Sequence, residues 1–103
     1  MAFKLQPKPV FTTDVLIPVP GDTPQKLSVQ FLHKRKKDLD AWATSVKEGR
    51  DEVEALLEVV EGWDADGDYS RETLANFLED YPGAGLAMEL AYYEESIGAE
   101  RKN

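Results

Sequence analysis

The sequence predicts a single α+β domain over residues 1–103, in which an N-terminal antiparallel β-hairpin is followed by about four short amphipathic helices. Two observations carry this prediction. Apolar and polar residues alternate in two segments of the first third of the chain, which is typical of half-buried strands. In the remainder, apolar residues recur three and four positions apart, which is typical of helices. A chain of 103 residues can bury a core as one domain, and without cysteine it has no disulfide or thiolate metal site.

The hairpin is expected over about residues 10–33. In "FTTDVLIPV", residues 11–19, every second residue lies on one mostly apolar side, and "KLSVQFLH", residues 26–33, repeats the alternation and places His33 on that side. The intervening "PVPGDTPQ" contains three prolines and a glycine, which favours a loop. An isolated hairpin is only marginally stable in water, so its apolar side should rest on helices.

Four helices are expected behind the hairpin, each carrying apolar residues at helical spacing. They are residues 35–48 (Leu39, Trp42, Ala43, Val46), 51–61 (Val53, Leu56, Leu57, Val60), 70–81 (Leu74, Phe77, Leu78, Tyr81) and 83–97 (Leu86, Leu90, Tyr93, Ile97). Asp51 and Ser70 are placed to cap two of the helices, while Gly62 and Gly98 are placed to end two of them. Residues 99–103 are expected to fray.

The net charge of −8 is unevenly distributed. Residues 1–50 hold nine Lys and Arg against five Asp and Glu, a net +4, whereas residues 51–103 hold three against fifteen, a net −12. An acidic field repels nucleic acid, and such asymmetry suits a basic partner or head-to-tail contact between copies. It is also compatible with a role in solubility alone.

Three alternating aspartates, Asp64, Asp66 and Asp68, resemble part of a calcium loop. An EF-hand loop needs glycine at its sixth position and a bidentate glutamate at its twelfth. Counted from Asp64, those positions hold Tyr69 and Ala75, so the ligand that closes the cage is missing. A polar turn between two helices is the favoured interpretation, and no metal or other cofactor is expected.

The segment "HKRKK" contains the basic cluster Lys34, Arg35, Lys36 and Lys37. Positive charge at the start of a helix opposes the helix dipole, so local structure does not explain the cluster. Either it is a solvated surface, or it contacts an acidic surface such as that of a neighbouring copy.

Little in the sequence points to catalysis or to a membrane. His33 is the only histidine, and no Ser-His-Asp set or His-Glu-x-x-His zinc pattern is recognisable. The first residues lack the apolar segment of a signal peptide, and no run of 18 apolar residues occurs. We therefore expect a soluble, cytosolic protein that is not an enzyme and binds neither membrane nor nucleic acid.

Layout and short phrases of the chain resemble a phage tail assembly chaperone family over nearly the whole length. The most specific phrases are "VEGWD", residues 60–64, and "YPGA", residues 81–84. The second strand, which ends in "FLHKRKKDLDAW", is part of the general layout that the resemblance covers. The resemblance implies a non-enzymatic protein that coats the tape-measure protein of a siphophage before the tail tube polymerises around it. It also implies a site of action in the cytoplasm of the host bacterium and absence from the finished particle.

Candidate contact residues are drawn from the basic cluster and from the family-like phrases. They are Lys34, Arg35, Lys36, Lys37, Trp63, Asp64, Tyr81 and Tyr92. The tape-measure protein is the expected partner, with head-to-tail self-association as a further contact. Two alternatives are a small structural protein of the virion tail or connector, and an acidic inhibitor or DNA mimic that acts on a host protein.

Overall fold

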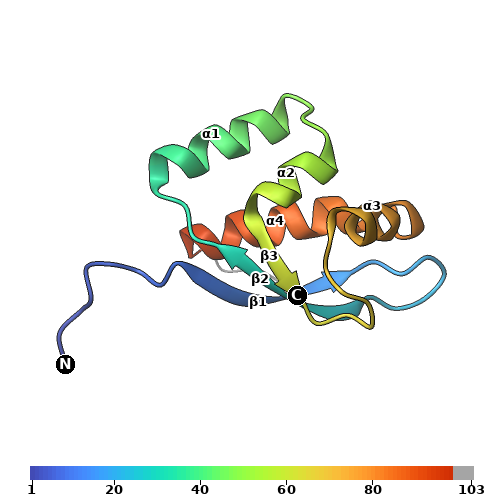
Figure 1. Ribbon diagram of the computed structural model, residues 1–103, viewed down its shortest axis with the longest axis horizontal. Helices are drawn as coiled ribbons and strands as arrows, with labels where there is room; N and C mark the ends of the chain where they lie inside the picture. Colours follow the sequence, from blue (N-terminus) through green and yellow to red (C-terminus); the bar gives the residue numbers. More distant parts are fainter. Residues whose placement is uncertain (99–103) are drawn as a thin grey trace.

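A computed structural model describes residues 1–98; the tail expected to fray, residues 99–103, lies outside the described residues. The chain forms a three-stranded antiparallel sheet with four helices on one of its faces (Figure 1). The elements in order are β1 (Val10–Ile17), β2 (Gln25–Leu32), α1 (Lys36–Lys47), α2 (Glu52–Val59), β3 (Val60–Trp63), α3 (Arg71–Asp80) and α4 (Ala84–Ile97). The predicted α+β class, a hairpin followed by four helices, is confirmed.

β1 and β2 form the expected antiparallel hairpin. Alternate residues of both strands point towards the helices and are buried, as the sequence pattern predicted. The fully buried members are Val15, Val29 and Phe31. β1 stops at Ile17 because the following Pro18 has no N–H to donate to a neighbouring strand. The prediction for His33 was wrong: β2 ends one residue earlier, and the His33 side chain is exposed.

The third strand was not predicted. The sequence indicated a helix through residue 61 with Gly62 as its stop, but α2 ends at Val59, and β3 follows and pairs antiparallel with β2. Two consecutive β-branched residues, Val59 and Val60, mark the change from helix to strand. Gly62 lies opposite Gln30, where a Cβ atom would stand only 3.2 Å from the Gln30 side-chain oxygen. Glycine therefore permits close pairing here rather than ending a helix.

Helix ends follow the predicted capping chemistry. The Asp51 carboxylate accepts a hydrogen bond from the backbone N–H of Glu54 at 3.1 Å, and α2 begins there. Ser70 and Thr73 form a reciprocal capping box at the start of α3. α4 ends at Gly98, whose φ of 72° lies in the left-handed region that favours glycine. The caps predicted at Asp51 and Ser70 and the stop at Gly98 are confirmed.

One aromatic side chain joins the sheet to the helices. Tyr92 on α4 is fully buried, and its ring centroid lies 5.0 Å from that of Phe31 in β2 and 4.9 Å from that of Trp42 in α1. Its hydroxyl donates a hydrogen bond of 2.9 Å to the carbonyl of Leu32. Burial raises the pKa of Tyr92 to about 12, so this donor keeps its proton. A second buried bond, from the Trp42 indole N–H to the carbonyl of Ala55 at 2.9 Å, fixes α1 to α2.

Replacing Tyr92 with phenylalanine keeps the ring packing and removes the hydroxyl, which leaves the Leu32 carbonyl without this donor. We expect the free energy of unfolding to fall by about 1–2 kcal/mol in urea denaturation. The matched control is Tyr93→Phe, because Tyr93 is only half-buried. A loss at position 92 no larger than at position 93 would contradict the role assigned to the bond.

Candidate functional site

α4 is apolar on two sides. One side is buried, because it packs against the sheet and against the other helices. Its buried apolar members are Ala84, Met88, Ala91 and Tyr92. The other side carries Leu86, Leu90 and Ile97, which are 58%, 51% and 55% exposed. Three large apolar side chains aligned on one helix face leave a stripe that has no partner among residues 1–98, which is typical of a docking surface.

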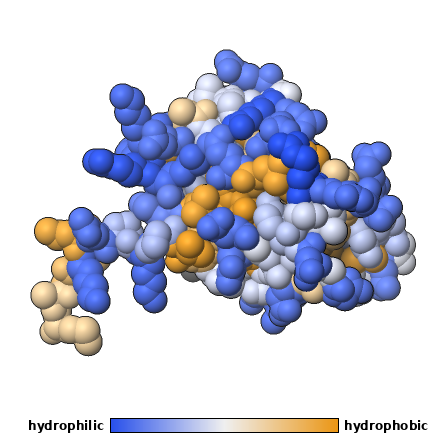
Figure 2. All heavy atoms as spheres, in the orientation of Figure 1, coloured by the Kyte–Doolittle hydropathy of each residue, from blue (hydrophilic) through white to orange (hydrophobic). Residues whose placement is uncertain are grey.

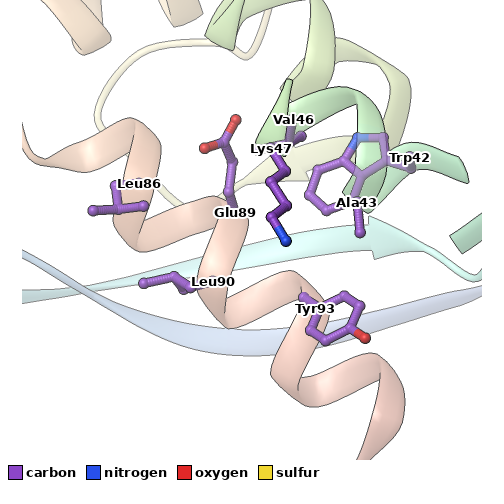
Figure 3. Close-up of a pocket in the computed structure, with 8 residues that line it drawn as sticks. All are labelled: Trp42, Ala43, Val46, Lys47, Leu86, Glu89, Leu90 and Tyr93. Atoms are coloured by element: carbon purple, nitrogen blue, oxygen red, sulfur yellow. The ribbon is translucent and has the colours of Figure 1, made fainter. Parts of the chain in front are cut away.

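The stripe borders an open groove of about 170 Å³ between α1 and α4, called here the α1–α4 groove (Figure 3). Four residues of each helix line it: Trp42, Ala43, Val46 and Lys47 from α1, and Leu86, Glu89, Leu90 and Tyr93 from α4. The side chains that line the groove are mostly apolar, and Lys47 and Glu89 are its charged members. An apolar strip with a polar rim suits a peptide or helix rather than a small polar substrate.

Glu89 is the unusual member of this groove. It is only 7% exposed, and its Oε2 atom is buried without a hydrogen-bond partner within residues 1–98. Burial, together with the nearby charge of Glu52, raises the pKa of Glu89 to about 7. Glu52 belongs to α2, and its carboxyl lies over the first turn of α4, where a Cβ atom on Gly85 would collide with it. The Lys47 ammonium points away from the Glu89 carboxyl, so the lysine does not neutralise it (Figure 3).

The stability of the chain should therefore change with pH in a defined window. The pKa of Glu89 is raised from 4.5 to about 7 in the folded chain, so its protonation favours folding. This contribution is fully present below pH 4.5 and is lost as the pH rises through about 7. We expect a higher urea midpoint at about pH 5.5 than at about pH 8.

Glu89→Gln should remove most of that difference, whereas Glu79→Gln, at an exposed position on α3, should preserve it. The charged groups beside Glu89 on neighbouring helices, Glu52 and Lys47, stay unchanged in both variants. An unaltered pH dependence in Glu89→Gln would contradict the assignment.

Comparison with known proteins identifies the family. A sequence model described as phage tail assembly chaperone matches residues 1–103, the whole chain. The chain belongs to this family. No curated protein and no solved structure gives a match. The resemblance seen in the sequence is thereby confirmed, together with a general role as a tail assembly chaperone.

The basic cluster of this chaperone is partly engaged within the fold. Lys34 Nζ lies 2.8 Å from Glu58 Oε2, and Arg50 Nη1 lies 2.6 Å from Glu58 Oε1, which ties the start of α1 to α2. The hydrogen bond from Lys34, supplemented by that from Arg50, lowers the pKa of Glu58. Lys36 pairs with Asp40 one turn along α1 at 3.2 Å. Ion pairs within the fold therefore account for two of the four cations: Lys34 through a tertiary contact with α2 and Lys36 through a local pair in α1.

Arg35 and Lys37, the other two cations of the cluster, are exposed at the start of α1. Neither lines the α1–α4 groove. Both remain available for contact with an acidic surface.

Trp63 and Tyr81 lie in a second place, at the opposite end of the hairpin from the N-terminus (Figure 1). Phe77 stands between them, with ring centroids 5.4 Å from Trp63 and 5.3 Å from Tyr81. These rings line two adjoining hollows of about 300 and 290 Å³, together called here the aromatic hollow. Asp64 is exposed next to Trp63, and its backbone N–H donates to the carbonyl of Ser28 at 2.9 Å.

Tyr92 lies in the core, so its side chain is not on a surface that a partner can reach. The predicted contact residues thus lie in three separate places: the start of α1, the aromatic hollow and the core. None of them lines the α1–α4 groove.

The aspartate-rich loop is held by its neighbours. The Trp63 indole N–H donates to the carbonyl of Gly67 at 2.7 Å, and the Thr73 hydroxyl donates to the carbonyl of Asp68 at 2.7 Å. The loop connects β3 to α3, not two helices as the sequence suggested. Within residues 1–98, no group of three or more His, Asp or Glu side chains is arranged to hold a metal ion. Among the described helices, none is long and apolar enough to cross a membrane.

Sequence reasoning missed the α1–α4 groove. The spacing of Leu86, Leu90 and Tyr93 indicates a helix but does not by itself indicate a groove, and Glu89 belongs to no recognised motif. The sequence did contain a signal for an exposed apolar side. The same helix carries a second apolar set, which includes Met88 and Ala91, and this set is the one that covers the sheet. A helix that is apolar on two sides has one side more than a small domain can bury.

Proposed function

We propose that this chaperone binds the tape-measure protein and keeps it soluble before the tail tube polymerises, by receiving an amphipathic helix in the α1–α4 groove. The observation that carries the proposal is the unpartnered stripe of Leu86, Leu90 and Ile97 beside that groove. Membership of the tail assembly chaperone family supports it. The role is one of binding and needs no catalytic step.

Helix-in-groove recognition fits the spacing of the exposed residues. Leu86 and Leu90 are one turn apart, about 6 Å along the axis of α4. A helix lying along the groove would meet both through its own apolar residues at i, i+3, i+4 and i+7. Long apolar helix surface aggregates unless it is covered, which is the property a tape-measure polypeptide would need a chaperone to control.

The net charge of the chain, and binding of many copies along one partner, both suit the same role. A net charge of −8 would keep a coated polypeptide soluble. Many weak sites repeated along one long partner gain avidity, so no single groove has to bind tightly, and all copies can leave when the tube replaces them. We infer that the protein acts in the host cytoplasm and is absent from the finished particle.

The double variant Leu86→Asp and Leu90→Asp tests the groove. Two carboxylates in the apolar strip should weaken binding of purified tape-measure fragments at least about tenfold, or 1.4 kcal/mol, in calorimetry. The control is Leu16→Asp, because Leu16 is as exposed as Leu86, at 58%, but lies on the opposite face of the sheet. Circular dichroism would show that both variants are folded. Equal affinity in the groove variant and the control would refute the proposal.

A structural role in the virion is the alternative that one observation favours. β1 is an edge strand of eight residues, with one side unpaired within the described part of the chain, and could add to the sheet of a neighbour. Mass spectrometry of purified particles separates the two roles. A structural subunit is present in the particle in stoichiometric amounts, whereas a chaperone is absent.

A further inference from the structure

Residues 1–9 form an exposed arm ahead of β1. They have no helix or strand and extend away from the body of the molecule (Figure 1). Phe3 and Leu5 are 88% and 91% exposed, well above the leucines of the α1–α4 groove. Figure 2 shows this apolar projection separated from the main surface. Large apolar side chains held this far into water are favourable only if another surface covers them.

The arm is also positively charged, and its backbone has limited flexibility. Lys4 and Lys8 form no ion pair with any residue among 1–98. Pro7 and Pro9 restrict the backbone to extended conformations, which lowers the entropy lost when the arm is ordered. In an extended chain, Phe3 and Leu5 fall on one side and Lys4 on the other. The arm can therefore present two apolar anchors with a cation on its outer side.

The aromatic hollow offers the complementary surface at the other end of β1. Trp63, Phe77 and Tyr81 are its half-buried apolar walls. Asp66 and Asp80 stand among the lining residues, and neither forms an ion pair within the described residues. The rim has one cation, Lys26, which lies 3.8 Å from Asp14.

We propose that the arm of one copy docks in the aromatic hollow of a second copy. Phe3 and Leu5 would pack against the rings, while Lys4 and Lys8 would face Asp66 and Asp80. Because arm and hollow are different surfaces at opposite ends of the hairpin, the contact is heterologous. Every pair keeps one unused arm and one unused hollow, so the contact repeats and copies line up in one direction.

This contact uses no residue of the α1–α4 groove and goes beyond the proposed function. A row of copies would present one groove after another to a long partner, which is the geometry that multivalent binding requires. Loss of the contact should leave the affinity of a single groove unchanged. An experiment can therefore show that the arm does not dock in the hollow without affecting the proposal that the groove binds a helix, and the reverse.

Two variants of the full chain test the contact by sedimentation over a range of concentrations. The arm variant is Phe3→Ser with Leu5→Ser, and the hollow variant is Asp66→Lys with Asp80→Lys. The wild-type chain should associate as concentration rises, and each variant should associate at least about tenfold more weakly. Glu48→Lys with Glu79→Lys changes the net charge equally, at exposed positions outside the hollow, and should associate as the wild type does.

Mixing the two variants gives the decisive result. The arm variant supplies only a hollow and the hollow variant only an arm, so an equimolar mixture should form one-to-one dimers and nothing longer. A wild-type chain that stays monomeric into the millimolar range, or an arm variant that associates like the wild type, would overturn the proposal. A tape-measure fragment that binds the arm variant normally but not the hollow variant would assign the hollow to that partner instead, and would also overturn it.

Because the chain has no cysteine, a disulfide trap is unambiguous. Leu5→Cys in one sample and Ala65→Cys in another should cross-link on mixing under mild oxidation. A chain carrying both cysteines should form a ladder of oligomers. A monomer with an internal disulfide would show that the arm folds back on its own hollow, contrary to the proposal.

Discussion

The rotation of α4 about its own axis is the constraint on which the rest of the structure depends. Tyr92 sets it, because the ring is enclosed by the hairpin and α1 and the hydroxyl is bonded to the Leu32 carbonyl. At about 100° per residue, Leu86, Leu90 and Ile97 then lie on the opposite side of the helix. The apolar stripe is thus a direct consequence of how the core is packed.

Glu89 lies at the boundary between the two faces of α4. Its carboxyl is out of water yet lacks a partner within the described residues, and the resulting rise of its pKa to about 7 means that its charged form opposes folding near neutral pH. A residue that lowers stability at the edge of an apolar groove is more readily understood through binding than through folding. The groove therefore combines two features that a purely structural helix would not need.

Local signals in the sequence were sufficient for the hairpin and for the helix starts at Asp51 and Ser70, because alternation and capping depend on near neighbours. These local signals failed where contacts between residues far apart in the sequence determine the structure. β3 is a four-residue strand that exists through its pairing with β2, and Lys34, just before α1, forms an ion pair with Glu58 of α2. The burial of Tyr92 could not be predicted either, since both apolar sets on α4 have helical spacing and only the tertiary packing selects one.

Binding of a tape-measure helix in the α1–α4 groove, as proposed, would cover the outward stripe of α4. Methyl NMR with a soluble paramagnetic agent measures this directly, by reporting the solvent exposure of leucines before and after a tape-measure fragment is added. We expect the methyl groups of Leu86 and Leu90 to become protected while those of Leu16 do not change. Saturating fragment that leaves Leu86 and Leu90 as exposed as before would contradict it.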